Sequence, residues 1–157
     1  MNNDLAATNT LISELIKKEK KANAEVIIAP TFVNLLEASK RLKDSSIKVA
    51  AQNMHFANHG AYTGEISATM LKSVGVNTVI LGHSERREFF SEDDNLLKQK
   101  IDKALDSFYW YDRDVFKLYY YEGHTLTGLA KKTGISRNSL FTTIDKVREQ
   151  LKELLDE

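Results

Sequence analysis

Short apolar runs alternate with longer amphipathic stretches along the first two thirds of the chain. Three runs rich in Val, Ile and Ala are typical of strands buried in a parallel sheet; they occupy residues 25–29, 47–51 and 78–81. Apolar residues at helical spacing surround these runs. The predicted helices cover residues 1–21, 31–42, 66–74 and about 91–105. This alternation predicts an α/β fold with three parallel strands.

The first two predicted helices should each bury one apolar face. The expected faces are Leu5, Leu11, Ile12, Leu15 and Ile16 in the first helix, and Phe32, Leu35, Leu36 and Leu42 in the second. The strand at 78–81 should be buried on both faces, because it is continuously apolar.

The pattern changes beyond residue 105, and we call residues 106–157 the tail and residues 1–105 the N-terminal part. Residues 106–121 hold 8 of the chain's 14 aromatic residues, which we expect to form a core. Helical spacing then predicts three helices, over residues 111–121, 125–133 and 136–155. Gly134 suits a turn with positive φ and Ser136 suits a helix cap. The tail therefore reads as a small all-α domain of three helices with a helix-turn-helix.

Composition narrows the class of protein. A hydrophobic content of 42%, a charged content of 28% and a net charge of zero describe a globular protein. No apolar run approaches the ~18 residues of a membrane span, and there are no cysteines, which favours a cytoplasmic protein without membrane contact. His55 and His59 lie in a loop with Asn and Gly, so we expect no metal site.

Ionisable residues follow the third predicted strand directly, as a charged turn at residues 82–87. The carboxyl ends of parallel strands are where the sites of α/β proteins lie. His83 is either a member of such a site or a residue that only caps its turn. Glu85, Arg86 and Arg87 are expected to form a solvated ion-pair cluster of little energetic value.

Residues 52–90 read QNMHFANHGAYTGEISATMLKSVGVNTVILGHSERREFF. This stretch resembles triosephosphate isomerase, and the resemblance extends from residue 1 to about 105. It implies part of a (β/α)8 barrel, the interconversion of triose phosphates without a cofactor, and a homo-oligomer. That family is itself the known example of a neutral electrophilic histidine at a helix N-terminus. By resemblance His83 and Glu85 take catalytic positions, and the dimer loop contains Asn53, Thr63 and Glu65.

The resemblance also implies that several active-site parts have no counterpart in these residues. It places Met1 just after the first barrel strand, which carries an asparagine and a lysine. A full barrel needs about 250 residues, and the base and phosphate loops follow its later strands. We therefore expect an isomerase homologue that is truncated and inactive in this form. Its open sheet edges should favour self-association.

Residues 126–152 read LTGLAKKTGISRNSLFTTIDKVREQLK and resemble the helix-turn-helix of sigma-factor region 4 and of small phage-type DNA-binding proteins. Residues 125–152 carry six basic and two acidic groups, a net charge of +4. The expected contacts to duplex DNA are Lys131, Lys132, Ser136, Arg137, Asn138 and Ser139. A plain helical bundle with mixed surface charge is the alternative for the tail. An artificial or erroneous joining of two genes is a third explanation of the whole chain.

Overall fold

Three short parallel strands form the centre of the N-terminal part. The computed structural model describes residues 2–18, 24–106 and 108–155, with side chains through Glu149. The strands are β1 (Ile27–Ile28), β2 (Lys48–Ala51) and β3 (Thr78–Val79), paired in the order β1-β2-β3. Ile28 lies opposite Val49, and Ala51 lies opposite Val79. The strands lie where the sequence predicts them and are shorter than predicted.

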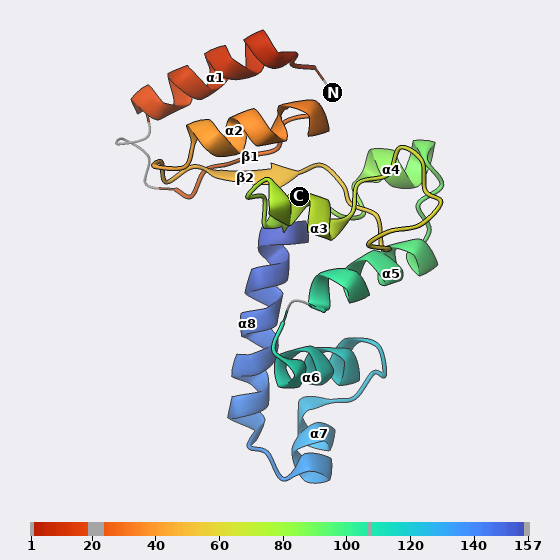
Figure 1. Ribbon diagram of the computed structural model, residues 1–157. Helices are drawn as coiled ribbons and strands as arrows, with labels where there is room; N and C mark the ends of the chain where they lie inside the picture. The colour runs from red at the N-terminus through yellow and green to blue at the C-terminus, as the bar shows by residue number, and fades with distance from the viewer. Residues whose placement is uncertain (1, 19–23, 107, 156–157) are drawn as a thin grey trace.

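Helices surround these strands in the alternating order expected of an α/β fold (Figure 1). They are α1 (Leu5–Lys18), the 3-10 helix η2 (Phe32–Asn34), α2 (Leu35–Arg41), α3 (Ala68–Ser73), α4 (Ser84–Phe89) and α5 (Asp94–Leu105). The predicted first helix extends further, but residues 19–21 lie outside the described residues. Asp93 caps α5, since its carboxylate accepts the backbone N–H of Leu96.

The predicted apolar faces of α1 and α2 are only partly correct. In α1, Ile12 is fully buried, whereas Leu5, Leu11 and Ile16 are exposed. Along α2 the buried apolar residues are spaced by three and four positions: Leu35 and Ala38, then Leu42 directly after the helix. Leu36 of α2 and Phe32 of η2 are exposed. Residues at this spacing share one side of a helix, and Leu36 points about 100° away from it. Only one narrow face of each helix contacts the core.

The principal core lies around β2 and β3 and joins α2, α3 and α5 to them. Its buried members are Leu35, Ala51, Met54, Leu71, Val76, Val79 and Leu81. Thr78 and Ile80, on the alternate face of the third strand segment, are only half-buried. Burial on both faces was therefore the wrong expectation, because three strands cannot close a barrel that would cover the second face.

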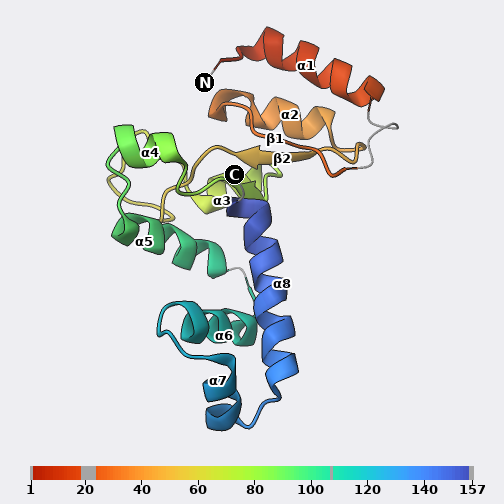
Figure 2. The ribbon, with the colours of Figure 1, turned by 180° about the vertical axis from the view of Figure 1, so that it is seen from behind.

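The tail consists of α6 (Trp110–Tyr120), α7 (Leu126–Thr133) and α8 (Arg137–Leu155). Their ends agree with the predicted helices to within one residue. Figure 2 shows α8 as a long column that extends away from the sheet, with α6 and α7 beside its N-terminal half. Val115, Leu129, Leu140 and Ile144 form a buried cluster within the tail.

The aromatic stretch at the start of the tail is not a core throughout. Phe116 is buried, but the exposed fractions of Tyr109, Trp110 and Tyr120 are 63%, 58% and 46%. Since α6 packs one face against α8, aromatic residues on its other faces stay in solvent. In the described part of the chain, no helix is both long and apolar enough to cross a membrane.

Candidate functional site

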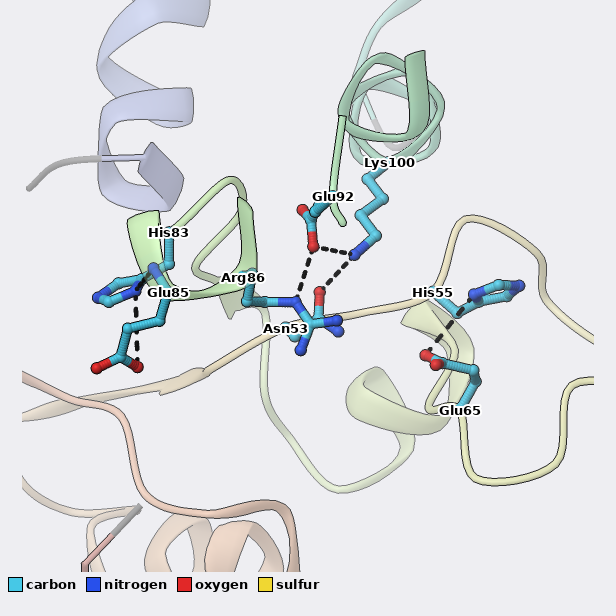
Figure 3. Close-up of polar contacts among 8 residues, drawn as sticks. All are labelled: Asn53, His55, Glu65, His83, Glu85, Arg86, Glu92 and Lys100. Atoms are coloured by element: carbon cyan, nitrogen blue, oxygen red, sulfur yellow. Dashed lines mark hydrogen bonds and ion pairs between the residues drawn. The ribbon is translucent and has the colours of Figure 1, made fainter. Parts of the chain in front are cut away.

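His83 lies just beyond β3, at the start of α4. Gly82 precedes it with φ of 72°, and a Cβ at Gly82 would come within 3.0 Å of a Leu97 methyl group. His83 is the N-cap of α4, and its Nδ1 accepts the backbone N–H of Glu85 at 3.2 Å (Figure 3). The charged turn predicted from the sequence is therefore a short helix, and the capping role of His83 is present in the structure.

The cap determines how the imidazole is oriented. Because Nδ1 accepts a hydrogen bond, a neutral His83 carries its proton on Nε2. The Glu85 carboxylate lies 3.9 Å from Nδ1, too far for a hydrogen bond, and 74% of that side chain is exposed. The His83 side chain is 27% exposed. This arrangement suits donation from Nε2 to a carbonyl, whereas Glu85 lies beside the opposite ring nitrogen.

A buried ionic network connects α4 and α5 to the start of the 53–65 loop. Lys100 Nζ donates to Glu92 Oε2 and to Asn53 Oδ1, each at 2.8 Å. Arg86 Nε donates to the same Glu92 oxygen at 2.7 Å. The side chains of Glu92 and Lys100 are 1% and 3% exposed. Figure 3 shows the four side chains converging between their elements.

Glu92 stays ionised within this network. Burial raises its pKa, but hydrogen bonds and charge from Lys100 and Arg86 outweigh that effect and hold the pKa below its ordinary value. Arg86 is therefore not part of a solvated surface cluster, and that expectation was wrong. Arg87, by contrast, pairs at the surface with Asp94 at 2.8 Å. The sequence gives no local signal for the network, because its members are six to 47 positions apart.

The predicted dimer-loop residues occupy two different environments. Asn53 is buried in the ionic network, whereas Thr63 and Glu65 are exposed. The His55 ring contacts the rings of Phe56 and Tyr62, with centroids 4.2 Å away in each case, and its Nδ1 is 3.7 Å from Glu65 Oε2. Among the described side chains, no three His, Cys, Asp or Glu are grouped so as to hold a metal ion.

The predicted DNA-facing residues gather around the turn between α7 and α8. Gly134 ends α7 with φ of 73°, and the Ser136 hydroxyl accepts the backbone N–H of Ser139 at 3.1 Å. The six residues are all exposed: Lys131, Lys132, Ser136, Arg137, Asn138 and Ser139. The Ser136 hydroxyl also donates to the Ser139 hydroxyl at 3.0 Å, so it already serves as a helix cap.

Comparison with known proteins identifies the N-terminal part. The family model of triosephosphate isomerase matches residues 1–108. The triosephosphate isomerases of Flavobacterium johnsoniae and Flavobacterium psychrophilum are each 58% identical over 106 residues, which is 67% of this chain and 42% of the relative. That of Clostridium acetobutylicum is 51% identical over 105 residues, again 67% of this chain and 42% of the relative.

The chain thus spans about two fifths of the length of these curated relatives. The matched region includes the parallel strands, His83, the ionic network and the 53–65 loop, and it ends three residues beyond the predicted boundary at 105. The family match covers more than half of the chain, and the chain belongs to the triosephosphate isomerase family.

Proposed function

We propose that this chain carries the histidine-bearing segment of a triosephosphate isomerase and does not isomerise triose phosphates by itself. The observation that carries this proposal is the placement of Glu85 beside His83. The reaction needs an electrophile on the carbonyl and a base that moves a carbon-bound proton. If His83 Nε2 polarises the carbonyl, the base has to face the substrate on that side, whereas Glu85 lies next to Nδ1.

The extent of the family match supports the same conclusion. The match stops at residue 108, the third residue of the tail, and the aligned segment spans 42% of the relatives' length. The matched residues do not include the later strands of a barrel, which contribute other groups to its site. Without them the reacting groups are not held together, and the rate advantage of proximity is lost.

A coupled assay with the purified 157-residue chain tests this proposal. The expected result is turnover equal to that of buffer, with a complete family member as the positive control. His83→Ala serves as the matched variant. Turnover above buffer that His83→Ala abolishes would contradict the proposal.

We further propose that residues 53–65 form a contact between copies of the chain, as the family resemblance implies. Thr63 and Glu65 are exposed, and Tyr62 is 44% exposed. Asn53, at the start of the loop, accepts a hydrogen bond from the buried Lys100. Sedimentation velocity at micromolar concentration should show dimers that Thr63→Arg weakens, and a monomer throughout would contradict this contact.

Duplex DNA binding by the tail is the second candidate function. The exposed Arg137 and Asn138 at the first turn of α8 favour it, because that end of a second helix enters the major groove in helix-turn-helix proteins. Arginine pairs with guanine and asparagine with adenine, each contact contributing roughly 1–3 kcal/mol of discrimination. Lys131 and Lys132, in the last turn of α7, are placed for phosphates.

One basic residue of the tail already has a partner within the molecule. Lys146 Nζ lies 2.5 Å from Asp112 Oδ2, and this pair joins α8 to α6. With three or four cations on phosphates, log affinity should fall against log salt with a slope of about −3 to −4. The affinity should accordingly be modest.

Fluorescence anisotropy with duplex DNA at 50 mM salt tests this candidate on the full chain. Arg137→Ala should relax sequence preference, and Lys132→Ala should weaken all sequences alike and reduce the slope by about one. Lys72→Ala, an exposed lysine of α3, is the matched control and should change nothing. A folded chain without salt-sensitive binding would exclude the candidate.

A further inference from the structure

We infer that the tail is the intramolecular partner of the open side of the N-terminal part, and that the two form one cooperative folding unit. The tail takes the place that the next β/α unit of a complete barrel would occupy. Three independent observations at the seam between the two parts carry this inference, and it depends on neither proposed activity.

The first observation is a hydrophobic cluster shared by the two parts. Leu105 of α5, Phe116 of α6 and Val147 of α8 are buried together, with Ile101 and Phe108 packed against them. Leu105 and Val147 are both 0% exposed. Side chains from both parts thus exclude water from one another, and separation of the parts would expose this apolar surface.

The second observation is a set of polar contacts between α5 and α6. Lys117 Nζ of α6 lies 2.7 Å from Asp102 Oδ1 of α5. Lys98 Nζ of α5 lies 4.8 Å from the centroid of the Tyr121 ring, which follows α6. Burial, together with the nearby Asp102 charge, raises the pKa of Tyr121 to about 12, so this phenol stays neutral at the seam.

The third observation is the position of the last helix. β3 is an edge strand of the sheet, and α8 packs against it. Figures 1 and 2 both show the C-terminal end of α8 reaching the sheet. A helix over an edge strand is one way in which proteins prevent strands of other molecules from adding there.

General rules of barrel topology connect these observations. In a (β/α)8 barrel, successive strands are neighbours, so the next strand would pair with β3 and its helix would pack beside α5. The tail contacts both of these positions, through α8 at β3 and through the shared cluster at α5. A second polypeptide that completes the barrel would therefore have to displace the tail.

The competing description is a pair of domains that fold independently. It is testable because the tail also has its own cluster, in which Val115 is buried with Leu129, Leu140 and Ile144. The N-terminal part has a separate cluster around Ile12, far from the seam in the sequence. A substitution that shortens a side chain in either cluster should reveal whether the loss of stability extends to the other part.

Hydrogen exchange of the full chain, followed by mass spectrometry, is the test. Val115→Ala should lower the protection of backbone amides against exchange about tenfold or more in α7. The amides of residues 48–51 in β2 should lose protection by the same factor. Ile12→Val should produce the reciprocal, smaller loss in both places. If Val115→Ala leaves too little folded protein, Ile144→Val gives the same comparison with a milder truncation. Loss of protection confined to the part that carries the substitution would overturn the inference.

Discussion

The two regions of this molecule use their charged residues in opposite ways. In the N-terminal part, Glu92 and Lys100 are almost fully buried and hold α4, α5 and the 53–65 loop in place. In the tail, the cations around the α7–α8 turn are all exposed, and the described side chains include one buried charge, Asp112, which pairs with Lys146. Buried charges have to be satisfied within the molecule, whereas exposed ones remain available to a partner. Lysine and arginine thus hold elements together in the N-terminal part, whereas around the α7–α8 turn they form an exposed basic surface.

The largest effect is expected from a matched pair of lysine substitutions, one in each region. Lys100→Met leaves Glu92 with one cation in a buried position, which should cost about 3 kcal/mol of unfolding free energy. Lys132→Met removes an exposed charge and should change stability by less than ~0.5 kcal/mol. Urea denaturation of the two variants measures the difference. Equal losses of unfolding free energy in the two variants would contradict the difference between buried and exposed charge.

A second comparison uses two glycines with the same backbone conformation. Gly82 and Gly134 have φ of 72° and 73°, so alanine at either position should cost roughly 1 kcal/mol for the left-handed conformation. A Cβ at Gly82 also meets Leu97 at 3.0 Å, whereas nothing lies within 4 Å at Gly134. The melting temperature of Gly82→Ala should therefore be lower than that of Gly134→Ala. The reverse order would show that Leu97 does not constrain the turn before His83.

The third prediction concerns alkaline pH at the seam. The pKa of Tyr121 is raised from 10.0 to about 12, so its contribution to stability is fully present below pH 10 and is lost as the pH rises toward 12. Tyr121→Phe has no phenol to ionise and should lose less stability over that range. Tyr109→Phe, at an exposed position of the same tail, is the control. Identical pH profiles for wild type and Tyr121→Phe would contradict the burial of this hydroxyl.

The smallest effect should come from the surface ion pair next to the network. Arg87 pairs with Asp94, but the two side chains are 44% and 90% exposed. An exposed pair contributes about 0–1 kcal/mol at most. Arg87→Ala should therefore leave the urea midpoint nearly unchanged. A loss as large as that of Lys100→Met would show that the surface charges also belong to the network.

Local features of the fold were accessible from the sequence. The ends of the tail helices could be predicted to within one residue, because Thr125 and Ser136 are capping residues and Gly134 ends α7 before α8 begins. The apolar runs located all three strands. By contrast, the burial of Glu92 and its bonds to Arg86 and Lys100 could not be predicted, since Glu92 lies between α4 and α5 and belongs to no helical or strand pattern. The exposure of Leu36 and Trp110 also depends on which face meets a neighbouring element.

The most direct test of the central claim, that the two regions form one folding unit, is equilibrium unfolding of the unmodified chain in urea. Trp110 is the only tryptophan and lies in the tail, so its fluorescence reports on that region. Far-ultraviolet circular dichroism reports on helices in both regions. One folding unit should unfold in a single transition, with the same midpoint and slope by both probes. Two separated transitions, with the Trp110 signal following only one of them, would contradict it.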